Sequence, residues 1–511
     1  MKMTRYTILI TILCFGLNSK AQIANGSLGY YNDARLFSST NAGMGSTARI
    51  QGIGGAQTSL GGDMSVIASN PAGIGFFNKS AFSFTPSLDF HESSSNYLGN
   101  NTSSFSNGFN FSNLGAVFYY GNGDYVDAKF KGGSLGVSIN RTNNFKNDIS
   151  YQGVNESNSI IDSYINSAGS LESNNLGGLV YGAFENYLID PVYDNGNQVG
   201  YGSPVFGNPR QTELVETSGS QYQINVAYGA NYGDFFYFGA GIGIATINYT
   251  KKRTYIEDSY LYLNNDDELV NDDIINFAEL NDKLTIEGAG INANLGVIIR
   301  PLPILTVGIS YITPTFYALT DNSSFDLFTS WNGLEILNND SSLTIINDRE
   351  FLSDVATSDY SLRTPGKLNV GATFFLGKLG FVSGDVEFVD HSRSQLKSSD
   401  FEVFADNESI DNLYTSVINY RLGVEFRIKQ MRVRGGYAYY ADPYTDSSID
   451  ASRNDVSFGL GYRNQDFFLD LAVVNRKTQD LYAPYILDGL EPVAEVENRS
   501  NTVAVTLGFN F

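Results

Sequence analysis

Residues 501–511 read NTVAVTLGFNF, and this stretch decides the fold. From Val503 onward every odd position is apolar, and every even position is small or polar. Alternation with a period of two over about ten residues is typical of a β-strand with one face against lipid and the other against a polar lumen. We therefore predict a transmembrane strand that ends on Phe511.

The same alternation recurs along the chain in fourteen segments, and the connections between them are by turns short and long. An even-stranded outer-membrane barrel requires short periplasmic turns and longer extracellular loops, whereas a soluble solenoid or sandwich does not. The sequence therefore predicts an all-β fold, a transmembrane antiparallel up-and-down β-barrel of about 14 strands. The expected strands are 80–90, 112–120, 132–150, 220–230, 235–257, 284–299, 304–317, 362–376, 379–390, 416–428, 431–440, 454–463, 465–475 and 500–511.

The composition is that of an exported chain. Residues 1–21 are predicted to be a Sec signal peptide, because Lys2 and Arg5 precede an apolar core at 6–17 that is too short to cross a bilayer as a helix. The single cysteine, Cys14, lies in this segment, so neither disulfides nor thiolate chemistry is expected in the mature chain. Aromatic residues make up 14% of the sequence and the net charge is −22, which argues against a nucleic-acid partner.

Arginines in the later strands decide which strand face points inward. An arginine facing lipid near the midplane costs about 2–4 kcal/mol, so these residues are predicted to face the lumen. Charged residues that line the lumen either steer a charged solute or form cross-strand ion pairs that rigidify the barrel. Because residues of both signs are present, the ion pairs are favoured. The candidate lumen charges are Arg421, Glu425, Arg427, Arg432 and Arg434.

Residues 22–79 precede the first strand and show no alternation. They are rich in Gly, Ala and Ser and hold too little apolar surface for a domain of their own. Because a barrel of about fourteen strands leaks unless something fills it, we expect this segment to plug the lumen of a barrel formed by 80–511. The stretch SNPAGIGFF at 69–77 predicts a rigid turn where the plug leads into the first strand.

The segment RIQGIGGAQTSLGGDMSVIASNPAGIGFF at 49–77 resembles the hatch of the FadL/TodX family, outer-membrane transporters of long-chain fatty acids and other hydrophobic compounds. Later stretches such as LRTPGKLNVGATFFL at 362–376 are similar to that family as well. The resemblance implies a monomeric barrel and passive, hatch-gated diffusion of a hydrophobic cargo, with sideways release at a kink in the third strand, here 132–150. It implies that the hatch motif comprises Asn70, Pro71, Ala72 and Gly73. Residues 22–48 are a departure from the family pattern.

Two of the long connections, 151–219 and 318–361, carry more apolar residues than a solvated loop needs. Those at 159–169 and 175–190 fall at helical spacing. The two connections either form a groove that catches cargo or pack on each other and cap the barrel. The candidate groove residues are Ile160, Tyr164, Phe184, Leu188, Phe328 and Trp331.

The sequence contains no nucleophile–His–acid set and no phosphate-binding loop, so we predict no enzyme activity and no cofactor. The acidic run at 264–273 lacks the ligand spacing of a calcium loop, and His91 and His391 are isolated, so no metal is expected. The expected partners are the bilayer of the bacterial outer membrane, a hydrophobic cargo and the barrel-insertion machinery, which would read the strand ending at Phe511. Two alternatives stay open: a general porin, and a barrel that docks exported proteins.

Overall fold

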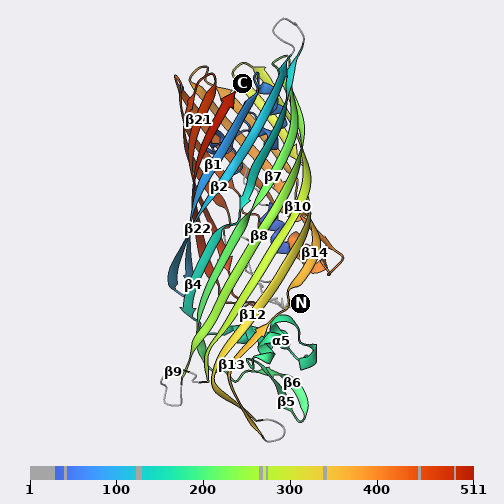
Figure 1. Ribbon diagram of the computed structural model, residues 1–511, viewed down its shortest axis with the longest axis vertical. Coiled ribbons are helices and arrows are strands. Elements are labelled where there is room, and N and C mark those ends of the chain that lie inside the picture. Colours follow the sequence, from blue (N-terminus) through green and yellow to red (C-terminus); the bar gives the residue numbers. More distant parts are fainter. Residues whose placement is uncertain are drawn as a thin grey trace, which may run out of the picture.

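The computed structural model describes residues 29–38, 43–121, 129–263, 269–271, 274–337, 342–446, 450–487, 489 and 491–511. The predicted signal peptide and most of the acidic run at 264–273 lie outside these residues. The described chain forms a closed barrel of fourteen antiparallel strands, as predicted (Figure 1). The last strand pairs with the first, in a register that places Ala81 opposite Asn510 and Tyr97 opposite Ala494.

Four of the fourteen barrel strands are interrupted and consist of two consecutive elements. Short turns join the strands at the upper end of Figure 1, which we call the short-turn end, and the lower end is the long-loop end. The barrel strands are β1 (Ala81–Tyr97), β2 (Asn100–Gly121), β3 (Phe130–Asn144) with β4 (Asn147–Val154), β7 (Asn208–Tyr232), β8 (Phe236–Leu263), β10 (Ile275–Leu302), β11 (Leu305–Ile312) with β12 (Phe316–Leu337), β14 (Ala356–Arg363) with β15 (Lys367–Phe375), β16 (Gly380–Asp390) with β17 (Gln395–Ser398), β18 (Ser416–Ile428), β19 (Met431–Tyr440), β20 (Arg453–Arg463), β21 (Phe467–Tyr482) and β22 (Ala494–Asn510).

The remaining elements are short. They are β5 (Asp190–Asp194), β6 (Asn197–Gly202), β9 (Leu269–Asn271), β13 (Leu343–Leu352), α1 (Tyr31–Ser38), α2 (Ala48–Gln51), α3 (Val66–Ser69), η1 (Pro71–Phe76), α4 (Ile160–Ala168), η2 (Ser173–Asn175), α5 (Gly178–Glu185), η3 (His391–Arg393) and α6 (Phe404–Leu413). None of the helices in the described part of the chain has the length and apolar character needed to cross a bilayer.

An apolar belt surrounds the barrel near the short-turn end. Large apolar side chains such as Leu295, Leu422 and Phe458 are more than half exposed there, while their neighbours along each strand point inward. The belt takes up about ten residues of each strand, the length that a tilted strand needs to cross the hydrocarbon layer. We treat the belt as the membrane-spanning part of the chain.

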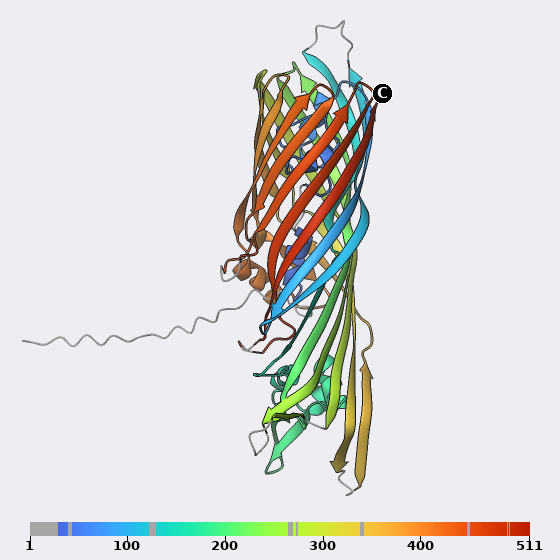
Figure 2. The ribbon, with the colours of Figure 1, turned by 90° about the vertical axis from the view of Figure 1, so that its left-hand side faces the viewer.

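Several strands continue far beyond the belt, where the sequence predicts loops (Figure 2). The predicted loops 91–111 and 258–283 are largely strand, because β1 and β2 meet at a tight turn after Tyr97 and both β8 and β10 have 28 residues. The predicted loops 318–361 and 476–499 also contain long strand extensions. Outside lipid, both faces of a strand can be polar, so the period-two apolar signal ends while the strand does not.

Residues 43–77, which we call the plug, lie inside the barrel near the short-turn end (Figure 1). All residues from 44 to 60 are buried. The plug has little regular structure, only the short helices α2, α3 and η1. It is held mostly by contacts with the inward-facing side chains of the barrel, as described next.

Candidate functional site

The Asn70-Pro71 turn is the centre of the plug. Asn70 is extended, as a residue before proline prefers, and Pro71 begins η1. The Asn70 side chain accepts a hydrogen bond from the Ala72 amide at 3.2 Å and donates one to the Thr58 carbonyl at 2.6 Å. Pro71, Ala72 and Gly73 are buried with it. The predicted turn is therefore present, and it ties the two halves of the plug together as well as leading into β1.

Glycines of the barrel wall make the room that the plug occupies. Gly229, Gly239 and Gly296 stand side by side on β7, β8 and β10, and a Cβ on any of them would overlap Asn70 or Pro71. Further glycines serve other parts of the plug in the same way. Gly308 and Gly371 lie against Thr58, and Gly423 and Gly436 lie against Ile53 and Gly54. The sequence analysis did not identify these wall glycines as contacts of the plug. Glycines at inward-facing positions of neighbouring strands are a signal that could have indicated them.

The carboxylate of Asp385 on β16 holds the plug at its middle. One of its oxygens accepts hydrogen bonds from the Gln57 amide at 2.8 Å, the Thr58 amide at 2.9 Å and the Thr58 hydroxyl at 2.8 Å. The Asp385 side chain has no exposed surface. Three hydrogen bonds therefore attach the plug to one buried carboxylate oxygen of the wall, and hydrogen bonds to a charged acceptor are stronger than neutral ones.

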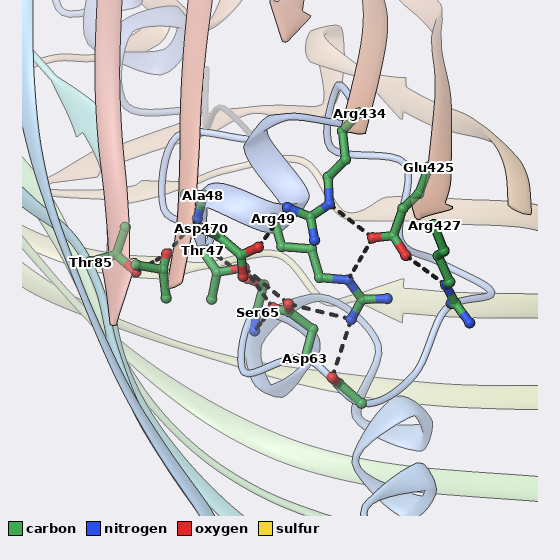
Figure 3. A network of polar contacts seen from close by, with 12 residues as sticks. Thr47, Ala48, Arg49, Asp63, Ser65, Thr85, Glu425, Arg427, Arg434 and Asp470 are labelled. Atoms are coloured by element: carbon green, nitrogen blue, oxygen red, sulfur yellow. Dashed lines mark hydrogen bonds and ion pairs between the residues drawn. The ribbon is translucent and has the colours of Figure 1, made fainter. Parts of the chain in front are cut away.

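A second attachment is a chain of charges drawn in Figure 3. Arg49 of the plug lies 3.6 Å from Asp63, also in the plug, and 3.5 Å from Glu425 on β18. Glu425 in turn pairs with Arg434 at 2.8 Å, and Arg434 with Asp470 at 2.6 Å. This chain of alternating charges joins the plug to β18 directly, and through β18 to β19 and β21.

The predicted lumen charges can now be placed. Arg421, Glu425 and Arg434 are buried and point inward, and Arg421 pairs with Glu387 at 3.3 Å. Arg427 is about a third exposed and pairs with Glu425 at 3.0 Å. Arg432 lies at the short-turn end, where it donates hydrogen bonds to backbone carbonyls of the β18–β19 turn. Four of the five therefore belong to ion pairs, which matches the rigidifying alternative.

The wall itself is incomplete beside β3. The ladder between β2 and β3 ends where Asn113 faces Asn140. On its other side β3 stays paired with β7, and that ladder contains a bulge between Arg141 and Asn143. Beyond Asn144 the strand is interrupted, and β4 pairs with β7 alone among the described residues. Side chains bridge β2 and β4, for example the hydroxyls of Ser104 and Ser150 at 2.7 Å. We call this stretch between β2 and β4 the seam; it falls within the predicted third strand, at its asparagines.

The apolar residues of the connection 151–219 form a cap at the long-loop end. Ile160, Tyr164, Leu188 and Trp331 are buried in one cluster, with Phe184 half-buried against it. Phe328 is not part of this cluster: it lies on the opposite face of β12, with its ring 5.6 Å from that of Phe277. The residues pack on one another, and this arrangement matches a cap and not an open groove.

The buried carboxylate of Glu257 on β8 fixes the cap. It accepts a hydrogen bond from the Ser159 hydroxyl and one from the Ile160 amide at 2.8 Å, so it satisfies the first turn of α4. It also accepts hydrogen bonds from Tyr255 and Gln211, each at 2.7 Å. Burial raises the pKa of Glu257, although these hydrogen bonds favour its charged form.

The helix α1 lies in the lumen between the plug and the cap. Its Phe37 side chain packs among aromatic rings next to the interruption of β3. The sequence analysis assigned this segment to the plug but predicted no helix in it, because an isolated run of eight residues with one modest apolar face gives almost no helix signal.

Nothing in the described residues points to a metal site, since they contain no group of three or more His, Cys, Asp or Glu that could hold an ion. His91 is in β1, where its ring lies 3.1 Å from the Asn144 side chain, and His391 begins η3. The predicted calcium alternative at 264–273 lies mostly outside the described residues.

Comparison of the fold with solved structures gives close matches in architecture. A FadL homologue from Pseudomonas aeruginosa superposes with a TM-score of 0.55 at 11% sequence identity, over 91% of this chain and 98% of that one. The toluene transporter TodX of P. putida gives a TM-score of 0.50 at 12% identity, over 92% and 99% of the two chains. No protein-family model matches the sequence, and no curated protein does. The chain therefore has the fold of the FadL-type barrels over nearly its whole length.

Proposed function

We propose that this chain is an outer-membrane channel through which hydrophobic small molecules diffuse passively, controlled by the plug. The observation that carries the proposal is the combination of a filled lumen with an unpaired seam in the wall. A filled lumen stops water and ions. The seam starts at the edge of the belt, where the β2–β3 ladder ends next to exposed Phe111 and Ile139, and there it would offer an apolar molecule a way between lumen and lipid. The solved structures with the same fold include a toluene transporter, which supports a hydrophobic cargo.

The seam can be locked without touching the plug. Ser104→Cys with Ser150→Cys places two thiols where the hydroxyls now lie 2.7 Å apart, across strands that share no ladder. A matched control is Asn475→Cys with Asn501→Cys, which joins β21 and β22, strands that are already paired. Because the only cysteine of the chain, Cys14, is in the predicted signal peptide, no other thiol would interfere.

The measurement is uptake of labelled toluene by cells that express each variant. We expect uptake to fall when the seam pair is oxidised and to recover on reduction, while the control pair has no effect. Equal uptake in both redox states would refute release through the seam.

The general porin, the first alternative, makes a different prediction for conductance. If the lumen were open, deletion of 22–79 would leave conductance in planar bilayers unchanged, whereas a plugged channel gains a large conductance. The second alternative, a docking barrel for exported proteins, predicts a protein partner in pull-down and no apolar molecule bound. The strand ending at Phe511, whose amide donates to the Ser80 carbonyl at 2.9 Å, is proposed as the insertion signal, and its test is the amount of assembled barrel after Phe511 is deleted.

A further inference from the structure

Three arginines on neighbouring strands face the lumen at the short-turn end of the barrel. Arg427 on β18 stands directly opposite Arg432 on β19, and Arg463 on β20 is two residues beyond the position that faces Arg432. Each of the three is partly exposed. They lie on the inward face, because the residue two positions further into the barrel is buried in each strand: Glu425, Arg434 and Gly461. We call Arg427, Arg432 and Arg463 the arginine triad.

Positive charge is in excess around the triad. The three carboxylates of this region, Glu425, Asp470 and Asp63, are paired with arginines of the chain of charges described above (Figure 3). In the described part of the chain, neither Arg432 nor Arg463 forms an ion pair with a carboxylate. Five arginines therefore stand against three carboxylates: Arg49, Arg427, Arg432, Arg434 and Arg463.

The guanidinium groups of Arg432 and Arg463 keep unused donors. Arg432 donates from one nitrogen to the carbonyls of Lys429 and Met431, at 2.8 and 2.9 Å. The Arg463 guanidinium carbon lies 4.5 Å from the centre of the Phe468 ring, and that side chain donates no hydrogen bond to the other described residues. A guanidinium has five N–H donors. Several donors at the mouth of the barrel are therefore left for a ligand.

This arrangement is unfavourable for the barrel alone. Like charges directly opposite each other on one face of a sheet destabilise the pair of strands. Arg427 and Arg432 are such a pair, and only Arg427 has a carboxylate partner. A planar guanidinium matches the geometry of an oxyanion and binds it through paired N–H donors. A bound oxyanion would therefore balance a charge that the wall leaves uncompensated.

We propose that the arginine triad binds a phosphate group on the periplasmic side of the membrane. The short turns of outer-membrane barrels face the periplasm, so the triad is open to that compartment. A phosphate monoester has nearly two negative charges at neutral pH and three acceptor oxygens, so it balances the excess charge better than a carboxylate does. The site goes beyond the proposed function, since it needs neither a hydrophobic cargo nor the seam.

The test uses the full mature chain, purified in detergent, at constant ionic strength. One arm replaces sodium chloride by inorganic phosphate, and the other adds phosphatidic acid to the micelles, with phosphatidylcholine as its reference. Binding is measured by calorimetry, and stability by the temperature at which heat-modifiable gel mobility is lost. The variants are Arg432→Gln, Arg463→Gln and the two combined, which leave every carboxylate with its partner. The control is Arg300→Gln at the short-turn end of β10, where Arg300 donates to the Pro303 carbonyl at 3.0 Å.

We expect a phosphate ligand to bind the parent and the Arg300→Gln control and to raise their transition temperatures. Each single variant of the triad should bind about tenfold more weakly, and the double variant should not respond. In chloride the double variant should melt no lower than the parent, because it relieves a like-charge contact. A response to inorganic phosphate supports a soluble ligand, and a response to phosphatidic acid alone supports a lipid headgroup.

Two results would overturn the site. One is a parent that responds to neither phosphate source, and the other is a double variant that responds as the parent does. A double variant that melts lower than the parent in chloride would refute the uncompensated charge on which the inference depends. Uptake through the seam is measured separately, so each of these results leaves the proposed function standing.

Discussion

Replacing Asp385 by alanine removes the acceptor of three hydrogen bonds between barrel and plug, from the Gln57 amide and from the amide and hydroxyl of Thr58. Hydrogen bonds to a charged group contribute about 1.5–3 kcal/mol each, and a buried amide left without an acceptor costs about 1–3 kcal/mol. Because these terms are not additive, we expect the docked plug to lose about 3–6 kcal/mol. Arg421 keeps its contact with Glu387 at 3.3 Å and so is not left alone.

A loss of that size changes the ratio of undocked to docked plug by about 100- to 20,000-fold, since each 1.4 kcal/mol is a factor of ten. The assay is single-channel conductance of purified protein in planar bilayers, where rare openings of the parent should become frequent. The matched control is Glu387→Ala on the same strand and face, because Glu387 is also buried and its partners Arg421 and Asn419 belong to the wall. Unchanged conductance in a folded Asp385→Ala barrel would refute the reasoning, as would an equal rise in the control.

Four further predictions concern other parts of the molecule. Gly239→Ala places a methyl group against Pro71, so it should raise channel conductance without changing any polar contact. Arg434→Met removes the ion pair of the buried Asp470 carboxylate, while Glu425 keeps Arg49 and Arg427, and it should cost the barrel about 3–5 kcal/mol, seen as a lower temperature for loss of heat-modifiable gel mobility. Tyr164→Asp buries a carboxylate in the cap, which should become sensitive to protease while barrel yield is unchanged. Burial raises the pKa of Asp33 on α1 to about 7, so α1 should leave its site more often as the pH rises. A cysteine in place of Ser38, which is 2% exposed, should then react with a maleimide about tenfold faster at pH 8 than at pH 6, and the rate should stay flat in Asp33→Asn.

The sign of the Asp33 effect follows from its surroundings. Desolvation and the nearby carboxylates of Asp321 and Asp406 raise the pKa of Asp33, while the hydrogen bond from Tyr360 at 2.6 Å lowers it. A raised pKa in the docked state means that docking is favoured by the protonated acid, fully below the ordinary pKa of 3.8, and weakens as pH rises through 7. Labelling rates are corrected for thiol ionisation with a reference cysteine at exposed Ser399. A rate that falls with pH after this correction would contradict the assignment.

The controls for the other variants are chosen by position. Gly384→Ala adds a methyl group at a wall glycine whose nearest atoms are 3.9 Å away, so it should leave conductance unchanged. Arg393→Met breaks an exposed ion pair and should not alter the transition temperature. Protease cleavage of Tyr164→Asp that is confined to the barrel strands, and not to the cap, would contradict the packing described here.

How far the sequence predicts this structure depends on where lipid lies. Inside the belt, one face of each strand must be apolar, so stretches such as 501–511 show their strand and their inward face directly. Beyond the belt that requirement ends, and the polar extensions of β1 and β2 look like loops. Phe328 was predicted to be a groove residue because the sequence indicated a loop at this position. The segment is strand β12, in which successive side chains point to opposite faces, so Leu327 faces the cap and Phe328 does not.

The plug shows a different limit. Its Gly-rich composition and the turn at Asn70 predict a segment that fits inside a barrel, and residues 44–60 are buried. Its attachment by Asp385 and its contacts with the wall glycines depend on the register between neighbouring strands. The sequence of a single strand does not show that register. The helix α1 has no signal of its own, because the buried aromatic residues that surround it, and not its own sequence, supply its stability.

The length of the strands would set where a cargo of the proposed channel first meets the barrel. β8 starts at the short-turn end and has 28 residues, so at about 3.3 Å per residue and a tilt of about 40° it rises roughly 70 Å. The apolar band of such a barrel is about 25 Å tall, so its far end stands roughly 45 Å above the hydrocarbon layer. A molecule that arrives from the surrounding water therefore meets the cap long before it meets the membrane surface. A molecule already dissolved in the lipid around the belt does not meet the cap, and under the proposed release route it would meet the barrel at the seam.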